Sequence, residues 1–439
     1  MKQILKGLVG SDELRQAFAV YAGFSRVALA VSGGSDSLAL MHLSLAWRQA
    51  TSAPNTDFIV LTVDHGLRPA AADEVKTVAK AAKAVGLDCQ ILTRKAPAGH
   101  TAVQANARAD RYRMLCAAAR EFGAGAIATG HTAEDQAETL LMRLARGSGV
   151  DGLAAMAPVS RIEDLALLRP MLGQTKRSLQ AVLQDLGVAW IEDPSNADPA
   201  FERPRLRTPG LTLAAAGLSR DPLALSARRL GRARAALEAA RDDANRALVT
   251  VNPDASVTIE RAGFDALPEE IRLRLLAYWL GLMGTPGAAM RMARVERSID
   301  QLATEDTVVT TFAGCWIVTA RGQIYLDREP GRYGLPETPL APGETVVWDR
   351  RFKIHLPATA KAGVVIRSAR VTNLPPALDA LRKQRKVRAS DLDKAPAAFR
   401  GNDVVACPLI GVMTEPVSFE VALPDPKTPA ADVPRFVDE

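Results

Sequence analysis

Six residues between a short apolar run and a helical pattern have the types and spacing of a phosphate-binding loop. They are Ser32, Gly33, Gly34, Ser35, Asp36 and Ser37. Two glycines allow a tight turn whose N–H groups can face an anion, and the N-terminus of the following helix adds positive potential. The serine hydroxyls are neutral donors, so the loop can hold phosphate oxygens without a lysine. No Gly-Lys pair occurs in the chain, which excludes a Walker A loop.

Asp36 is the member of this loop that points to a metal. A bare carboxylate repels phosphates unless a divalent cation such as Mg²⁺ lies between them. The same letters also fit a serine-rich turn in which an aspartate caps a helix. Six specific residues at a strand-to-helix junction favour the phosphate site, and Asp36 then indicates a nucleotide bound with its metal.

A second group of polar residues follows a short strand expected at 125–129. Asp135 and Glu138 are three residues apart, which places both acids on one face of the helix expected at 133–145. Asp135 could complete a Mg²⁺ site with Asp36, and Glu138 could receive an amine. Acids are also favoured in any first helical turn by the helix dipole, so the pattern alone leaves both interpretations open. His131 lies beside these acids, which favours a functional role over a hydrogen-bonded histidine at a strand end.

A third group follows the continuous apolar run at 58–63, which is typical of a buried parallel strand. Asp64 and His65 stand directly after this run. For His65 we favour a side chain that faces the ligand over a structural histidine.

These groups share one expected architecture. Strands are expected at 27–31, 58–63, 89–93 and 125–129, and helices at 10–22, 38–47, 71–85, 102–122 and 133–145. This alternation predicts an α/β fold with an open, Rossmann-like parallel sheet and helices on both faces. Ligands of such sheets gather at the carboxyl ends of the strands, where all three polar groups lie.

The rest of the chain predicts two further domains. We expect a catalytic α/β domain at 1–215, a mainly helical domain at 216–335 with a β-hairpin at 308–326, and a small α+β domain at 336–439. Within 203–234, eight arginines accompany one acid, Asp221, in a helical background. A Pro- and Gly-rich stretch at 329–345 marks a linker. A second basic run, at 382–388, contains Arg385 and Lys386.

Composition bounds the class of protein. A chain of 439 residues with 48% hydrophobic and 24% charged residues indicates a globular protein of two or three domains. Its four cysteines form no C-x-x-C pair, which excludes a cysteine-only zinc knuckle and fits a reducing cytoplasm. We find no signal peptide and no apolar run long enough for a membrane helix. The sequence leaves a homodimer open.

Seven motifs together resemble one family, the bacterial tRNA(Ile)-lysidine synthetases, within the N-type ATP pyrophosphatase (PP-loop) superfamily. The likeness extends over residues 20–207, and its first loop alone is shared by several activities. The motifs are 32–37, 63–68, Arg108-x-x-Arg111-Tyr112, 130–139, 146–149, Arg169-Pro170 and 190–198.

The resemblance implies that lysine is joined to the wobble cytidine of an isoleucine tRNA with a CAU anticodon. Cytidine O2 would attack the α-phosphate of ATP and release pyrophosphate, and the ε-amine of L-lysine would then displace AMP. The resemblance implies that Asp36 and Asp135 hold Mg²⁺, that Glu138 recognises the lysine amine, and that these three carry the catalysis. The implied ATP site comprises residues 32–37 with Asp64, His65, Arg111 and His131.

Two sets of basic residues are candidates for tRNA contact. Arg203, Arg205 and Arg207 stand where few acids could neutralise them, which favours phosphate contact over a solvated or acid-paired face. For Arg385 and Lys386 a solvated helix is an equal alternative. Another PP-loop tRNA-modifying enzyme, such as a tRNA thiolase, and a tRNA-binding protein without activity are the competing functions. The absence of C-x-x-C disfavours sulfur chemistry.

The chain departs from the family pattern in two places. Thr132 and Glu134 replace a histidine and an aspartate in the pattern His-His-x-Asp-Asp, in which Asp135 is kept. Arg203-Pro204-Arg205 replaces an Arg-Asn-x-x-Arg pattern, which leaves the roles of individual arginines open.

Overall fold

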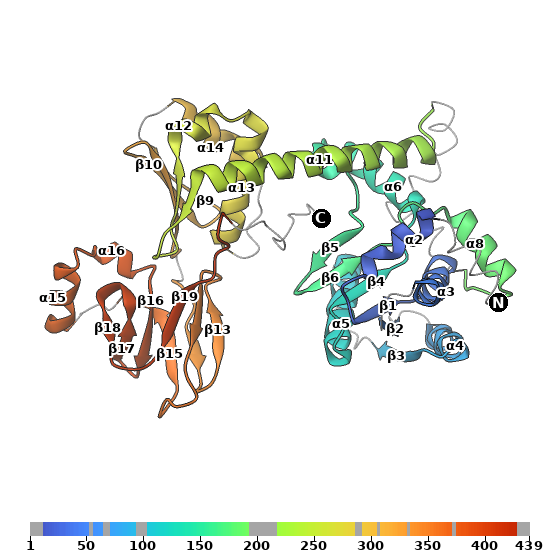
Figure 1. The fold of residues 1–439 in the computed structure, drawn as a ribbon, viewed down its shortest axis with the longest axis horizontal. Coiled ribbons are helices and arrows are strands. Elements are labelled where there is room, and N and C mark those ends of the chain that lie inside the picture. The colour runs from blue at the N-terminus through green and yellow to red at the C-terminus, as the bar shows by residue number, and fades with distance from the viewer. Residues whose placement is uncertain are drawn as a thin grey trace. The chain divides into compact units, whose positions relative to one another are not determined.

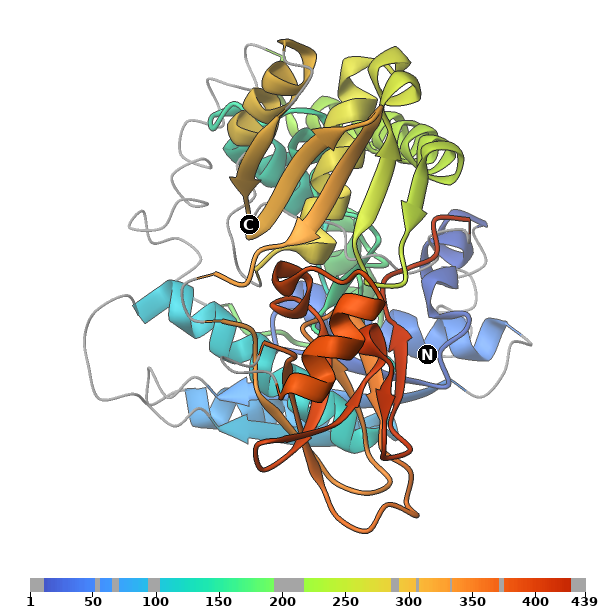
Figure 2. The same ribbon diagram turned by 90° about the vertical axis from the view of Figure 1, so that its left-hand side faces the viewer.

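The chain divides into two compact units near Arg234, and each is described by itself (Figures 1 and 2). The computed structural model describes residues 12–51, 56–64, 71–93, 103–192, 217–285, 292–304, 308–331, 334–370 and 375–427. His65, Arg203, Arg205 and Arg207 lie outside these ranges.

The first unit is built on a six-stranded sheet with the order β3-β2-β1-β4-β6-β5. Its strands are β1 (Arg26–Ala30), β2 (Asp57–Asp64), β3 (Asp88–Thr93), β4 (Ala126–Thr129), β5 (Val159–Ile162) and β6 (Leu165–Leu168). All neighbouring strands pair in parallel except β5, which runs antiparallel to β6. The expected α/β class with a parallel sheet is therefore confirmed.

Helices cover both faces of this sheet (Figure 1). They are α2 (Asp12–Phe18), the 3₁₀ turn η1 (Ala19–Tyr21), α3 (Ser35–Ala50), α4 (Ala71–Ala84), α5 (Val103–Phe122), α6 (Ala133–Leu144), α7 (Val150–Leu153) and α8 (Lys176–Asp185). Val27 and Leu29 of β1 belong to one core cluster with α3, α4 and α8, whereas Ala28 and Ala30 belong to another with α5. This alternation is the period of two that a strand buried on both faces requires.

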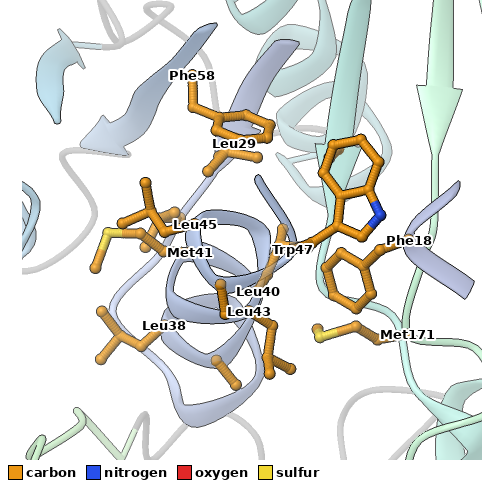
Figure 3. Packing of buried hydrophobic residues seen from close by; sticks show 14 of the residues in the cluster. Phe18, Leu29, Leu38, Leu40, Met41, Leu43, Leu45, Trp47, Phe58 and Met171 are labelled. Carbon is orange, nitrogen blue, oxygen red and sulfur yellow. The ribbon is translucent and has the colours of Figure 1, made fainter. Parts of the chain in front are cut away.

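The core beside α3 is the larger of these two clusters (Figure 3). Trp47 of α3 packs with Phe18 and Met171, and the rings of Trp47 and of Phe58 from β2 both contact Tyr21 edge to face. The expected helix at 38–47 is thus buried on nearly all sides, which explains why its apolar residues form a run and not a stripe. Burial holds the N-terminus of α3 at a fixed place over the sheet.

Tyr21 gives this core one internal hydrogen bond that can be tested. Its hydroxyl lies 2.8 Å from Ser44 Oγ, and Ser44 in turn donates to the Leu40 carbonyl oxygen at 2.7 Å. Tyr21→Phe removes one bond but leaves Ser44 with its backbone acceptor, so we expect a loss of about 1 kcal/mol in the free energy of unfolding. Urea unfolding followed by tryptophan fluorescence measures it. An unchanged midpoint would mean that the bond contributes nothing.

The second unit begins within α11 (Arg220–Leu248) and contains a five-stranded antiparallel sheet with the order β7-β8-β11-β10-β9. Its strands are β7 (Val249–Val251), β8 (Val257–Glu260), β9 (Val309–Phe312), β10 (Cys315–Ala320) and β11 (Gln323–Arg328). Its further helices are α12 (Arg261–Ala266), α13 (Glu269–Met283) and α14 (Met292–Thr304). The sequence predicts a mainly helical middle domain with one hairpin. In the structure, that hairpin is part of a five-stranded sheet.

Two smaller sheets follow in the same unit (Figure 2). One has the order β12-β15-β16-β17-β18 and the other β13-β14-β19. Their elements are β12 (Thr338–Leu340), β13 (Thr345–Trp348), β14 (Phe352–His355), β15 (Val364–Ser368), α15 (Pro376–Gln384), α16 (Ala389–Leu392), β16 (Pro396–Arg400), β17 (Asp403–Cys407), the 3₁₀ turn η3 (Pro408–Ile410), β18 (Val412–Met413) and β19 (Ser418–Val421). The stretch expected as a linker contains β12.

Buried charges join these small sheets to the five-stranded sheet. Arg351 is fully buried and donates to Asp349 at 2.8 Å and to the Lys394 carbonyl oxygen at 2.8 Å. Arg328 of β11 reaches the same Asp349, and Lys394 pairs with Asp327 of β11. Because an unpaired buried charge is costly, these partners depend on one another and fix the two parts of the unit together.

Within the described residues, no helix is long and apolar enough to span a bilayer. All four cysteines are free thiols, and burial raises the pKa of Cys89 and Cys116 to about 11.

Candidate functional site

The carboxyl ends of β1 and β4 lie side by side and form the centre of the candidate site. The strands pair in parallel, with Ala30 opposite Thr129. On the other side of β1 lies β2, so the strand order reverses at β1, and in open α/β sheets ligands commonly bind at such a point. The helices α3 and α6 begin directly after β1 and β4, which brings the loop at 32–37 and the acids of α6 to the same edge.

The phosphate loop is closed by hydrogen bonds among its own residues. Ser37 Oγ donates to the Gly34 carbonyl oxygen at 3.0 Å and accepts the Ser32 backbone N–H at 3.1 Å. The Ser32 and Ser37 hydroxyls are also 3.3 Å apart. These bonds hold the loop in one shape before any ligand arrives, which lowers the entropy cost of binding.

Gly33 is required by both backbone angle and space. Its φ of +92° lies in the left-handed region that disfavours side chains. A Cβ at this position would lie 2.7 Å from Ile191 Cδ1, and the Ile191 N–H donates to the Gly33 carbonyl oxygen at 3.0 Å. The segment that contains Ile191 therefore rests directly on the phosphate loop.

Gly130 allows β4 to approach the start of α3. A Cβ on Gly130 would lie 3.0 Å from the Asp36 carbonyl carbon and oxygen and 3.1 Å from the Ser37 nitrogen. These neighbours are backbone atoms inside a helix, so they have little freedom to move. The glycine at this strand end thus sets how closely the two halves of the site meet.

Asp36 carries a carboxyl group whose surroundings disfavour its charge. Burial raises its pKa, whereas the positive charge of Lys176 and a 3.0 Å hydrogen bond from the Ser35 hydroxyl lower the pKa. The negative charges of Asp135 and Glu134 raise it further. A cation at this position would relieve the repulsion among three acids.

Asp135 serves the helix as well as the site. Its Oδ2 accepts the Thr132 backbone N–H at 2.8 Å and the Thr132 hydroxyl at 3.1 Å, which caps the N-terminus of α6. Thr132, which stands where the family pattern has a histidine, thus takes part in this helix cap. The cap fixes the position of the Asp135 carboxylate near that of Asp36.

Glu138 and His131 complete the polar lining contributed by β4 and α6. Glu138 is one turn after Asp135 and is only 9% exposed. His131 Nδ1 lies 2.8 Å from the Thr129 hydroxyl, which orients the imidazole ring at the strand end. Asp64 is the last residue of β2, and Arg111 lies half-buried in α5.

The residues present fit a Mg²⁺ ion that is bound together with a nucleotide. Among the described residues, no group of three or more His, Cys, Asp or Glu side chains is arranged to hold a metal alone. Mg²⁺ commonly takes one or two carboxylates and completes its shell with substrate phosphates and water. The two aspartates beside a glycine-rich loop match that incomplete donor set.

Glu134 shows what the second departure from the family pattern does. One carboxylate oxygen accepts the Lys176 backbone N–H at 3.0 Å, and the other accepts from Arg220 Nη1 at 2.9 Å. Glu134 thereby ties α6 to the first residues of α8 and α11. Arg220, counted in the arginine-rich segment, is acid-paired, which is the alternative that the sequence left open.

Lys176 and Ile191 were not predicted from the sequence to belong to the site. The only local signal for Lys176 is Thr175, which caps α8 by accepting the Ser178 N–H at 3.0 Å. Ile191 stands within the motif at 190–198, whose resemblance gave it no contact.

The basic run expected at 382–388 follows α15 in the second unit. Arg382 and Lys383 both pair with Asp379, and Arg388 pairs with Asp391. Arg385 and Lys386 are exposed and, within the residues that the structure describes, form no ion pair.

A cavity of about 950 Å³ lies in the second unit, away from the phosphate loop in sequence. Trp316 and Tyr325 of the five-stranded sheet face it with Phe352 and Lys394 of the following sheets, and Arg388 lies on its wall. Lys394 Nζ stands 5.3 Å from the centre of the Trp316 ring. Flat aromatic surfaces beside cations suit stacked bases, but two acids, Asp254 and Asp327, also line this cavity, and Lys394 pairs with Asp327.

Comparisons of the sequence with known proteins find relatives within one family. A family model described as the PP-loop domain matches residues 10–211. The tRNA(Ile)-lysidine synthase of Bradyrhizobium sp. is 41% identical over 344 residues, which cover 74% of this chain and 96% of that protein. That of Ruegeria pomeroyi is 36% identical over 392 residues, which cover 88% of this chain and 89% of that protein. Among solved structures, the U34-tRNA thiolase NcsA from Methanococcus maripaludis aligns with a TM-score of 0.40 and 18% identity, covering 49% of this chain and 76% of that chain.

Proposed function

The chain belongs to the tRNA(Ile)-lysidine synthase family of PP-loop ligases, and from that premise we propose which of its residues perform each part of the reaction. The observation that carries the proposal is the closed, lysine-free loop at 32–37 beside the carboxylates of Asp36 and Asp135. Such a loop binds phosphates through backbone N–H groups and hydroxyls. We propose that its ligand is ATP.

The residues around the loop divide the work of adenylation. Asp36 and Asp135 would hold Mg²⁺, which when bound offsets the charge that develops on the phosphates during in-line displacement. The backbone of Gly33 and Gly34 and the hydroxyls of Ser32, Ser35 and Ser37 orient the phosphates of ATP. Asp64, His65, Arg111 and His131 complete the ATP site in this proposal.

Glu138 is proposed to receive the ε-amine of L-lysine. A buried carboxylate favours an ammonium group that brings its own positive charge and hydrogen-bond donors. Glu138→Gln keeps the size of the side chain and removes the charge. We expect the KM for lysine to rise by about tenfold or more, with pyrophosphate release nearly unchanged. Separate measurements of the two steps check this, with Glu121→Gln on the exposed surface of α5 as the control. Equal loss in both steps would remove Glu138 from lysine recognition.

The substrate tRNA(Ile) with its CAU anticodon is proposed to contact more than the first domain. Arg203, Arg205 and Arg207 would contact its phosphates, as would Arg385 and Lys386. The lack of ion pairs at Arg385 and Lys386 within the described residues supports this role.

We propose that the chain has three domains, at 1–215, 216–335 and 336–439. We also propose a cytoplasmic location, which is consistent with the free thiols, and a homodimer, which analytical ultracentrifugation would test.

One assay separates the proposed function from its rivals. Purified protein is incubated with Mg-ATP, labelled lysine and an isoleucine tRNA transcript with a CAU anticodon. We expect label to enter the tRNA together with release of AMP and pyrophosphate. Incorporation from a sulfur donor in place of lysine would favour a tRNA thiolase. Binding of the tRNA without release of pyrophosphate would favour a tRNA-binding protein without activity.

A further inference from the structure

The phosphate loop contains no lysine, but the fold brings one to it from a distant segment. Lys176 is the first residue of α8, and 139 positions separate it from the last residue of the loop. Helix α8 packs against α3, the helix that begins in the loop, through Leu179, Val182 and Leu183 of their shared core. The fold therefore brings Lys176 from a distant segment to the helix that follows the loop.

The backbone on both sides of Lys176 is fixed to the catalytic helix. The Ala133 N–H, at the start of α6, donates to the Gln174 carbonyl oxygen at 2.9 Å. The Lys176 N–H donates to Glu134 at 3.0 Å, and Thr175 caps the same turn of α8. Lys176 thus starts from a Cα position that is set by α6, the helix that also contributes Asp135.

The side chain of Lys176 is available for a ligand. It is exposed, and no ion pair or hydrogen bond engages its Nζ within the described part of the chain. Glu134, the nearest acid in the hydrogen-bond network, already binds Arg220 Nη1 and the Lys176 backbone. The Lys176 ammonium group, which pairs with no acid among the described residues, therefore has its donors available for phosphate oxygens.

We propose that Lys176 contacts the phosphates of bound ATP and takes the part that a loop lysine takes in other phosphate-binding loops. The proposal rests on the proposed function and adds a residue to it. Lysine suits the role as a compact charge on a flexible stem, since it can follow the phosphates as they move.

The charge of Lys176 would act on the leaving group. In the first step a bond forms between cytidine O2 and the α-phosphorus, and the bond from that phosphorus to the bridging oxygen breaks. The electron pair of the broken bond stays on that oxygen, so pyrophosphate leaves with the added negative charge. Lys176 keeps its proton throughout and donates hydrogen bonds to pyrophosphate oxygens, which stabilises that charge as it grows.

The test compares three substitutions by pyrophosphate release in the absence of lysine. Lys176→Ala is expected to lower kcat/KM for ATP by about 100-fold, as loss of a charge-stabilising donor does elsewhere. Lys176→Arg keeps the charge and is expected to retain more activity than the alanine variant. Arg177→Ala removes the neighbouring exposed cation of the same helix and is expected to change the rate by less than about twofold.

Two further measurements keep the outcome decisive. The Tm of each variant shows whether the loss comes from unfolding, and Lys176→Gln replaces the alanine variant if that protein does not fold. Near-normal kcat/KM in a folded Lys176→Ala or Lys176→Gln overturns the proposal, as does an equal loss in Arg177→Ala. If the wild type itself adds no lysine to tRNA but still releases pyrophosphate from ATP, the proposed function fails while the role of Lys176 can still be measured.

Discussion

Asp36→Asn is expected to lower pyrophosphate release by about 1,000-fold or more, while tRNA binding stays close to that of the wild type. The substitution keeps the shape of the side chain and removes the charge that would hold Mg²⁺ beside the phosphates. The tRNA contacts proposed for this chain are made by other residues, so they are left intact. Single-turnover pyrophosphate release and filter binding of tRNA measure the two effects separately.

The same substitution is expected to leave the folded protein at least as stable as the wild type. Burial and the neighbouring acids raise the pKa of Asp36 in the folded state. An acid with a raised pKa contributes stability below its unfolded pKa, and this contribution is lost as the pH rises through the folded pKa. The ionised carboxylate therefore destabilises the metal-free protein at neutral pH, and asparagine removes that cost. The Tm difference between variant and wild type should grow with pH across this window.

Asp185→Asn is the matched control, because Asp185 is an exposed acid at the end of α8 in the same unit. It should change neither activity nor Tm. Normal turnover by Asp36→Asn would remove Asp36 from the metal site. A large fall in Tm would instead show that Asp36 supports the fold and that the activity loss has a structural cause.

Gly33→Ala is expected to lower both stability and activity. Alanine at a φ of +92° costs roughly 1–2 kcal/mol of backbone strain. Its Cβ would also displace Ile191, whose Cδ1 lies 2.7 Å from that position. Because the loop must hold phosphates within a fraction of an ångström, we expect pyrophosphate release to fall by about 100-fold.

Gly23→Ala separates the two causes. Gly23 has a φ of +98°, and no atom lies within 4 Å of the position of its Cβ. It should therefore lose a similar free energy of unfolding without losing activity. Ile191→Ala combined with Gly33→Ala should recover part of the lost pyrophosphate release, because the shorter side chain makes room. If Gly23→Ala and Gly33→Ala behave alike in both assays, the contact with Ile191 has no role.

Local patterns were enough to predict four of the six strands of the sheet and the polar residues that follow β1 and β4. Strands β1 and β2 are buried on both faces, so their sequences are continuous apolar runs that are easy to recognise as strands. The loop at 32–37 could be recognised because it lies between a strand and a helix. Asp36 and Asp135 follow two strands of the predicted sheet, and the parallel pairing of β1 with β4 brings them together.

Contacts between distant segments were beyond the reach of those patterns. Ile191 bonds to Gly33 of the loop, and Lys176 bonds to Glu134 at the start of α6. Both contacts join segments far apart in the sequence, which no local periodicity can predict. The hairpin of β5 and β6 was missed because four-residue strands are too short for an alternating pattern to stand out. In the middle of the chain most residues are helical and strands such as β7 are short. The sequence therefore predicted only a hairpin where the structure has a five-stranded sheet.

The backbone bond between Ile191 and Gly33 also bears on the order in which the protein is made. A ribosome synthesises Gly33 early, but the partner that supports its carbonyl is added only after more than 150 further residues. Until then the loop lacks both that hydrogen bond and the side chain that covers it. A nascent chain that stops before residue 191 would contain the whole loop and all six strands of the sheet, yet would bind nucleotide poorly. Nucleotide binding would thus indicate that synthesis has passed residue 191.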